Sequence, residues 1–275
     1  MSHLPILIHP QYKSLNMLGL KFSLLAGLLA LSTVSIADAR MQQRSHAAHK
    51  GAVAATKLRD SHNGLGLDSV SPRTDGCKEY YLVTTRGTQE PQGPSFAFSS
   101  MVAQTLAALP NGEQYNTPYP AVYDGSSPLR GMDALKGFLE STVQRCPHAK
   151  MALLGYSQGA YITSLALQTH ADDNVARAVR AIVLVGNPVH QPGFAGNVDG
   201  NGGKSTAGAQ GAIYSPFTPT VPAAFAGRVL DVCLAGDYVC DGKNPHPNGM
   251  VHGDYGKTQS VQTMGAQFLV RQLRA

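Results

Sequence analysis

Hydrophobic and polar positions along the chain form two kinds of block. Short runs that are apolar almost throughout predict buried strands, and apolar residues at helical spacing predict amphipathic helices. Because the two kinds alternate, the pattern predicts an α/β fold with a central, mostly parallel sheet covered by helices on both faces. The strands are expected at 79–85, 119–123, 150–154, 181–185 and 228–233, and the helices at 95–109, 129–144, 160–168, 175–179 and 261–273.

The N-terminal region has a different pattern. An apolar run at 22–36 follows basic residues and ends at the small-residue sequence 37–39, which together predict a signal peptide over residues 1–39. Met17 is an alternative start, because the residues before it add little to this signal. The strictly apolar part is short for a membrane span, so no stable span is expected. The sequence therefore predicts a secreted, extracellular protein.

The rest of the chain divides into an arm and a globular domain. Residues 40–75 are polar without an apolar period, which predicts a pro-segment or a disordered arm. Residues 76–275 are expected to form a single domain. The formal charge of +5 comes without a long basic block, so the surface is mildly basic and no nucleic-acid partner is expected.

The chain has four cysteines, which are expected to pair in an oxidising compartment. Three connectivities are open to them. Because Cys233 and Cys240 are close in sequence, a local disulfide between them is favoured, which leaves Cys77 for Cys146. The other use of four cysteines is a metal site, but no C-x-x-C pair is present, and neither a metal nor a cofactor is expected.

The pentapeptide Gly155-Tyr156-Ser157-Gln158-Gly159 lies between a predicted buried strand and a predicted helix. A G-x-S-x-G sequence in that position is typical of the nucleophile elbow of α/β-hydrolases. The tight turn presents the serine hydroxyl outward, and the N–H of the next residue points toward developing negative charge. The alternative interpretation is a flexible glycine-rich turn. We interpret Ser157 as a nucleophile.

A serine nucleophile needs a base and a carboxylate that orients the base. In α/β-hydrolases the carboxylate follows the serine in the chain and lies on a loop after a later strand. Asp237 follows the last predicted strand and lies inside the loop that a disulfide between the last two cysteines would close. Asp231, within the strand, and Asp241, outside the loop, are the alternatives.

The base is expected after the acid in the chain. His252 lies in a loop just before the last predicted helix, from which it can reach back over the sheet edge to Ser157. His246, six residues upstream, is the alternative.

Four separated motifs together resemble the cutinase family, the small secreted serine esterases of α/β-hydrolase fold. The motifs are R-G-T-x-E-P at the end of the first strand, G-Y-S-Q-G-A at the elbow, C-x6-C containing G-D-x-V-C, and H-G-x-Y-G before the last helix. The resemblance covers about residues 76–273. It implies a single-domain α/β-hydrolase.

The resemblance also implies roles for individual residues. Ser157 would be the nucleophile, His252 the base and Asp237 its orienter. The backbone N–H groups of Thr88 and Gln158 would form the oxyanion hole, with a threonine where many family members have a serine. The four cysteines match the family's two disulfides, which are Cys77–Cys146 and Cys233–Cys240.

The implied reaction is hydrolysis of carboxylic esters through an acyl-enzyme, on a cutin-like polyester or on short- to medium-chain esters, by a monomer. The substrate would include plant cell-wall or cuticle polymers. Segments 193–211 and 214–225 look more like the cutinase-like and acetylxylan-esterase members, so a carbohydrate esterase is the alternative. A catalytically silent wall-binding or elicitor protein is a third interpretation, and the complete set of catalytic residues argues against it.

Overall fold

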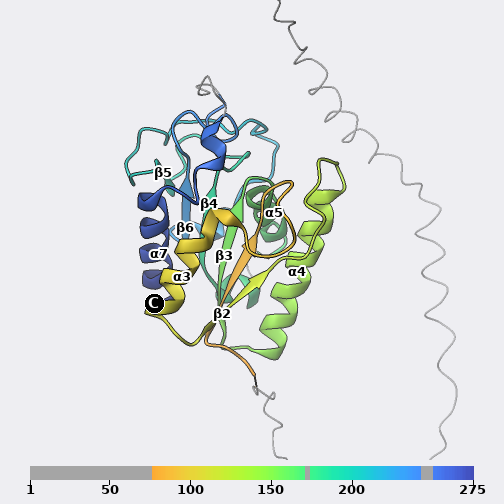
Figure 1. The fold of residues 1–275 in the computed structure, drawn as a ribbon. Helices are drawn as coiled ribbons and strands as arrows, with labels where there is room; N and C mark the ends of the chain where they lie inside the picture. Colours follow the sequence, from red (N-terminus) through yellow and green to blue (C-terminus); the bar gives the residue numbers. More distant parts are fainter. Residues whose placement is uncertain (1–75, 171–173, 243–249) are drawn as a thin grey trace, which may run out of the picture. The chain divides into compact units, whose positions relative to one another are not determined.

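The computed structural model describes residues 76–170, 174–242 and 250–275, so the predicted signal peptide and arm lie outside the described residues. Its centre is a six-stranded sheet with the order β2-β1-β3-β4-β6-β5, and every neighbouring pair of strands is parallel (Figure 1). The predicted parallel α/β architecture is confirmed. The strands are β1 (Tyr80–Thr85), β2 (Gly112–Asn116), β3 (Lys150–Tyr156), β4 (Val179–Val185), β5 (Asn197–Val198) and β6 (Val229–Val232).

Helices cover both faces of the sheet (Figure 1). On one face α3 (Ser99–Ala108) packs with α7 (Gln259–Arg274), and on the other α4 (Ser127–Arg145) packs with α5 (Gln158–Leu167). A short helix, α6 (Asn174–Ala178), leads into β4. The 3-10 helices are η2 (Phe96–Phe98), η3 (Ala223–Phe225) and η4 (Met250–Gly253).

The central strand β3 shows how the apolar runs of the sequence supply two cores. Successive side chains of a strand point to opposite faces of the sheet. Ala152, Leu154 and Tyr156 accordingly join the cluster with α3 and α7, while Met151 and Leu153 join the cluster with α4 and α5. Because both faces are buried, the strand is apolar at nearly every position, as expected of a central parallel strand.

One predicted strand is wrong and two strands were missed. Residues 119–123 are not a strand, and the edge strand β2 lies earlier, at Gly112–Asn116. Proline lacks the N–H that a ladder needs; Pro118 directly precedes this stretch and Pro120 lies within it. The two-residue strand β5 lies inside the glycine-rich segment, where no apolar run marks it.

Two disulfides tie the ends of elements together. Cys77 is bonded to Cys146, so the entry to β1 is fixed to the C-terminal end of α4. Cys233 is bonded to Cys240, directly after β6. This is the pairing that the resemblance implied. On the loop-entropy model, the disulfide that closes the longer loop stabilises the fold by about 4 kcal/mol.

Gly159, the second residue of α5, lets this helix lie against the end of β1. A Cβ atom on Gly159 would lie 2.0 Å from the carbonyl oxygen of Thr85 and 2.6 Å from that of Arg86. Both are backbone atoms, which cannot move aside as a flexible side chain can. The small residue at this position of the pentapeptide is therefore required by the close approach of helix and strand.

We expect the Gly159→Ala variant to be destabilised by about 3 kcal/mol, because the added methyl group overpacks this contact. Gly137 in α4 is the matched control, since it is exposed and a Cβ there meets nothing within 4 Å. Gly137→Ala is expected to stabilise the helix by up to about 1 kcal/mol. Urea unfolding of both variants measures the difference, and equal stabilities would contradict the packing argument.

Candidate active site

Ser157 lies at the turn from β3 into α5 with φ 53° and ψ −119°. This left-handed conformation is uncommon for a residue with a side chain and is typical of strained functional turns. The Ser157 N–H donates to the carbonyl of Val185 at the end of β4 (3.1 Å), which anchors the turn to the neighbouring strand. The helix begins with Ala160 donating to Ser157, so the Gln158 N–H precedes the first intrahelical bond.

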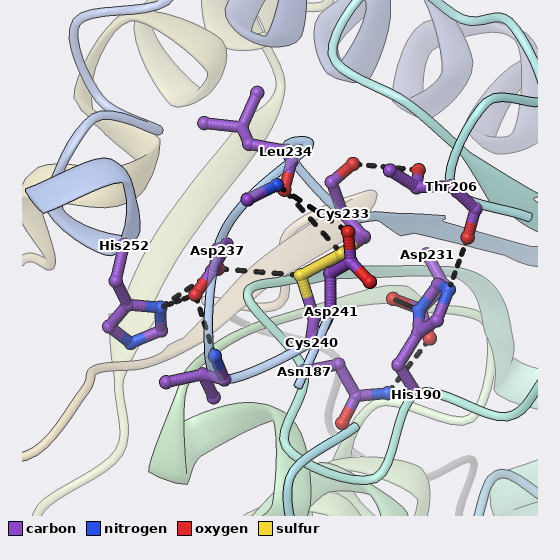
Figure 2. The surroundings of a disulfide bond; sticks show 12 residues. Asn187, His190, Thr206, Asp231, Cys233, Leu234, Asp237, Cys240, Asp241 and His252 are labelled. Carbon is purple, nitrogen blue, oxygen red and sulfur yellow. Dashed lines mark hydrogen bonds and ion pairs between the residues drawn. A yellow bond between two sulfur atoms is a disulfide. The ribbon is translucent and has the colours of Figure 1, made fainter. Parts of the chain in front are cut away.

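Asp237 and His252 are brought together directly. The two carboxylate oxygens of Asp237 lie 2.9 and 3.0 Å from Nδ1 of His252 (Figure 2). Asp237 is completely buried, whereas the His252 side chain keeps a small exposed area. A buried carboxylate needs such partners, because an unpaired charge away from water is costly. The Val239 N–H (2.9 Å) and the Tyr255 hydroxyl (2.6 Å) also donate to this carboxylate.

The disulfide loop 233–240 holds the backbone of Asp237. The Asp237 N–H donates to the Leu234 carbonyl (3.0 Å), and the Asp241 N–H donates to the Asp237 carbonyl (2.6 Å). Figure 2 shows the loop folded tightly around the Cys233–Cys240 disulfide, with Asp237 directed toward His252. The position of this carboxylate is therefore determined by covalent closure and by hydrogen bonds.

His252 lies at the same edge of the sheet as Ser157. Its ring stacks on Tyr156, the residue before Ser157, with 5.0 Å between ring centroids, and the Tyr156 hydroxyl donates to the His252 carbonyl (2.9 Å). A Cβ on Gly186 would lie 2.7 Å from the imidazole Cε1. Val185, the residue before Gly186, accepts the N–H of Ser157. Ser157 and His252 thus flank the same end of β4.

The segment after β1 passes beside Ser157. A Cβ on Gly87 would lie 3.3 Å from the Cβ of Ser157. Thr88, the next residue in the chain, therefore lies close to the elbow. The Glu90 carboxylate organises the turn by accepting from the Gly87 N–H (2.5 Å), the Ser95 hydroxyl (3.0 Å) and the Phe96 N–H (2.9 Å).

The buried Arg86 side chain stabilises the same segment by hydrogen bonds. Its Nε donates to the Glu90 carbonyl (2.9 Å), and its terminal nitrogens donate to the carbonyls of Thr117 and Tyr119. Arg86 and Glu90 are part of the R-G-T-x-E-P motif, but the sequence predicted no role for them. Their task here is to hold the backbone of 87–88 against the elbow.

The alternative acids and base have other positions. Asp231 lies in β6, where it accepts from Asn187 Nδ2 (2.8 Å) and lies 3.0 Å from Nδ1 of the buried His190 (Figure 2). Burial lowers the pKa of His190, but the charges of Asp231 and Asp241 and its hydrogen bonds outweigh this, so its pKa is raised. Asp231 therefore belongs to a second, internal ion pair. His246 lies outside the described residues.

Exposed apolar side chains surround this edge of the sheet. The Tyr238 ring lies 5.8 Å from His252, and the Phe96 ring lies 5.2 Å from Tyr156. The Val122 carbonyl accepts from the Gln158 side chain (3.2 Å), which places the exposed Val122 beside the elbow. Tyr238, Phe96 and Val122 are each more than two-fifths exposed. This rim offers apolar contact area next to Ser157.

Within residues 76–170, 174–242 and 250–275, the helices include none long and apolar enough to cross a membrane. The same residues contain no cluster of three or more histidine, cysteine or acidic side chains suited to a metal ion.

Comparison with known proteins gives a consistent family. The model of the cutinase family matches residues 76–273. A solved cutinase-like protein from Cryptococcus sp. is 38% identical, with a TM-score of 0.67 over 71% of this chain and 95% of that chain. Cutinase pbc1 of Pyrenopeziza brassicae is 29% identical over 66% of this chain and 77% of its own length. Acetylxylan esterase 2 of Talaromyces purpureogenus is 27% identical over 73% of this chain and 92% of its own length.

The matched region contains the whole described fold, from the first disulfide cysteine to the last helix. It also contains the elbow, the Asp237–His252 pair and the segment after β1. The chain therefore belongs to the cutinase family and is a serine hydrolase of carboxylic esters with the α/β-hydrolase fold.

Proposed function

We propose that Ser157, His252 and Asp237 form the catalytic triad of this esterase. The observation that carries the proposal is the buried Asp237 carboxylate bonded to Nδ1 of His252 at the edge where Ser157 turns into α5. Because Nδ1 is engaged as a donor, the acceptor nitrogen of the neutral ring is Nε2. The ring is then in the tautomer that can remove a proton from a serine hydroxyl.

Acylation follows from this arrangement. His252 takes the Ser157 proton as Oγ attacks the ester carbonyl, and Asp237 stabilises the imidazolium that forms. The tetrahedral oxyanion is bound by the N–H groups of Thr88 and Gln158, each contributing about 3 kcal/mol of transition-state stabilisation. His252 then protonates the leaving alcohol, which leaves the acyl group on Ser157.

Deacylation repeats the same steps with water. His252 removes a proton from water, the hydroxide attacks the acyl carbonyl, and the Ser157 oxygen leaves with the returned proton. The close approach of Gly87 to Ser157 supports the proposed oxyanion hole, because it brings the backbone after β1 next to the elbow. Neither a metal nor a cofactor takes part in these steps.

The substrate that we propose is a polyester of the cutin kind, or an ester with an acyl chain of medium length, hydrolysed outside the cell. Two observations support it. The exposed rim of Tyr238, Phe96 and Val122 offers an apolar surface to acyl chains. Two disulfides in a chain with no free cysteine among the described residues fit an oxidising compartment. The acetylxylan esterase among the relatives supports the second candidate, a carbohydrate esterase that removes acetyl groups.

The two candidates differ in acyl-chain preference, which p-nitrophenyl esters from acetate to palmitate measure. The polyester proposal predicts that kcat/KM peaks at butyrate or longer, with the Ser157→Ala variant as the blank. Activity confined to acetate would overturn it in favour of the carbohydrate esterase. If no ester is hydrolysed faster than by the Ser157→Ala blank, the proposed triad is wrong.

A further inference from the structure

We propose that Tyr255 is a positioning residue of the active site, whose buried hydroxyl fixes the Asp237 carboxylate in the orientation that His252 requires. This inference rests on the proposed function, because it assigns a task to a side chain that supports the triad. Tyr255 lies between η4 and α7 and is completely buried.

The direction of the hydrogen bond is determined by the partners of the hydroxyl group. The Leu234 N–H donates to the Tyr255 oxygen (3.1 Å), so this oxygen acts there as an acceptor. The single hydroxyl proton is then directed to Asp237 Oδ2, at 2.6 Å. Tyr255 therefore links the first residue after Cys233 to the acid at the other side of the same loop.

The nearby Cys240 sulfur is a much weaker acceptor for the Tyr255 hydroxyl proton than the Asp237 carboxylate is. Cys240 Sγ lies 3.3 Å from the Tyr255 oxygen and 3.4 Å from Asp237 Oδ2, the second contact being drawn in Figure 2. A disulfide sulfur carries no proton and is a weak acceptor. These contacts are packing contacts, and among the described residues the carboxylate accepts hydrogen bonds from O–H and N–H groups.

The carboxylate receives its other hydrogen bonds from two directions. The Val239 N–H donates to Oδ1 (2.9 Å), and His252 Nδ1 lies within reach of both oxygens. Among the described residues, the Tyr255 hydroxyl is the one donor to Oδ2 that lies outside both the disulfide loop and the proposed triad. Without it, rotation of the carboxylate about its Cβ–Cγ bond would lose one of its restraints.

The hydroxyl also shares the negative charge of Asp237. Burial raises the pKa of Tyr255 well above its ordinary value, and the charge of Asp237 raises it further, so the phenol keeps its proton wherever the enzyme works. A charge-assisted hydrogen bond to Oδ2 lowers the charge that Asp237 presents to His252. Without the hydroxyl, Asp237 presents more of its negative charge to His252, which favours the imidazolium.

Three other ionisable groups lie around Asp237, His252 and Tyr255, and a substitution at Tyr255 leaves all three in place. Tyr156 from β3 stacks on the imidazole, and the tilted ring of Tyr238, from the disulfide loop, lies 5.8 Å from it between centroids. Asp231 from β6 contributes to the electrostatic surroundings of Tyr255. Since a substitution at Tyr255 alters none of these three groups, a change in the pH profile can be attributed to the hydroxyl.

The test is the pH dependence of p-nitrophenyl ester hydrolysis by the full protein carrying Tyr255→Phe. We expect kcat to fall roughly tenfold with KM unchanged. We also expect the acid limb of the kcat/KM profile to move upward by roughly half a pH unit. Tyr80→Phe is the matched control, because Tyr80 is also buried and its hydroxyl donates to the Leu109 carbonyl, in α3's C-terminal cap.

The control separates positioning from general stability. Tyr80→Phe is expected to lower the melting temperature while its kcat and pH profile stay those of the unmodified protein. A Tyr255→Phe variant with kcat within twofold and an unshifted acid limb overturns the proposal. If that variant does not fold, 3-fluorotyrosine at position 255 replaces it: a stronger donor should move the acid limb downward, and no shift overturns the proposal.

The failure of this inference can be told apart from the failure of the proposed function. Activity that persists in Ser157→Ala contradicts the triad and the role of Tyr255 together. An inactive Ser157→Ala variant with an unaltered pH profile in Tyr255→Phe overturns the role of Tyr255 alone.

Discussion

Replacing Ser157 with alanine is expected to lower kcat by about six orders of magnitude, with the fold retained. The variant loses the only atom that can form the acyl-enzyme, and hydrolysis must proceed by direct attack of water. The strained backbone at φ 53° suits alanine no better than serine, so the melting temperature should change little. The residual rate comes from substrate binding and from the N–H groups of the oxyanion hole.

The size of this effect is best tested with His252→Ala and with the double variant. Residues that act as one unit are not additive, so His252→Ala should cost nearly as much as Ser157→Ala, and the double variant should cost no more than either. A phosphonate ester followed by mass spectrometry supplies a second readout, because it should label the unmodified protein and leave Ser157→Ala unlabelled. Additive losses, or labelling of the alanine variant, would contradict the assignment of Ser157 as nucleophile.

The buried parallel strands could be predicted from the sequence, because they are buried on both faces and therefore apolar at nearly every position. This holds for the runs at 150–154 and 181–185, which form β3 and β4 with two residues more at one end. The edge strand β2 could not be predicted in the same way. Its sequence GEQYN contains only one large apolar residue, because an edge strand needs to bury little.

Parts of the candidate site could be predicted where a short local motif has a physical cause that is visible in the sequence. The elbow glycines are such a case, since a Cβ on Gly155 or Gly159 would meet backbone atoms. The disulfide loop around Asp237 is a second case, because two cysteines close together in the sequence predict a local disulfide. The supporting side chains were not predictable, because their partners are distant in the chain: Tyr255 bonds to Leu234, and Gln262 accepts from the N–H of Met101. Periodicity carries no information about such contacts.

Two buried carboxylates, each beside a histidine, make Asp237→Asn a discriminating experiment. We expect this variant to lose about four orders of magnitude in kcat. Val239, Tyr255 and His252 all donate to the carboxylate, but asparagine offers a single oxygen. When its amide group faces Nδ1, that nitrogen must act as acceptor, so the proton moves to Nε2. The imidazole is then in the tautomer that cannot take the Ser157 proton.

Asp231→Asn is the matched control, because Asp231 is also buried, pairs with His190 and was an alternative acid on sequence grounds. It should lower the melting temperature, since the His190 pair loses its charge, yet leave kcat within about threefold. Both variants are compared by thermal unfolding and by ester hydrolysis at the pH optimum. If Asp231→Asn were the inactive variant and Asp237→Asn the active one, the internal pair would have to be the catalytic pair. The completely buried His190 makes that arrangement unsuitable, because its imidazole has no exposed surface at which to meet a substrate, whereas that of His252 does.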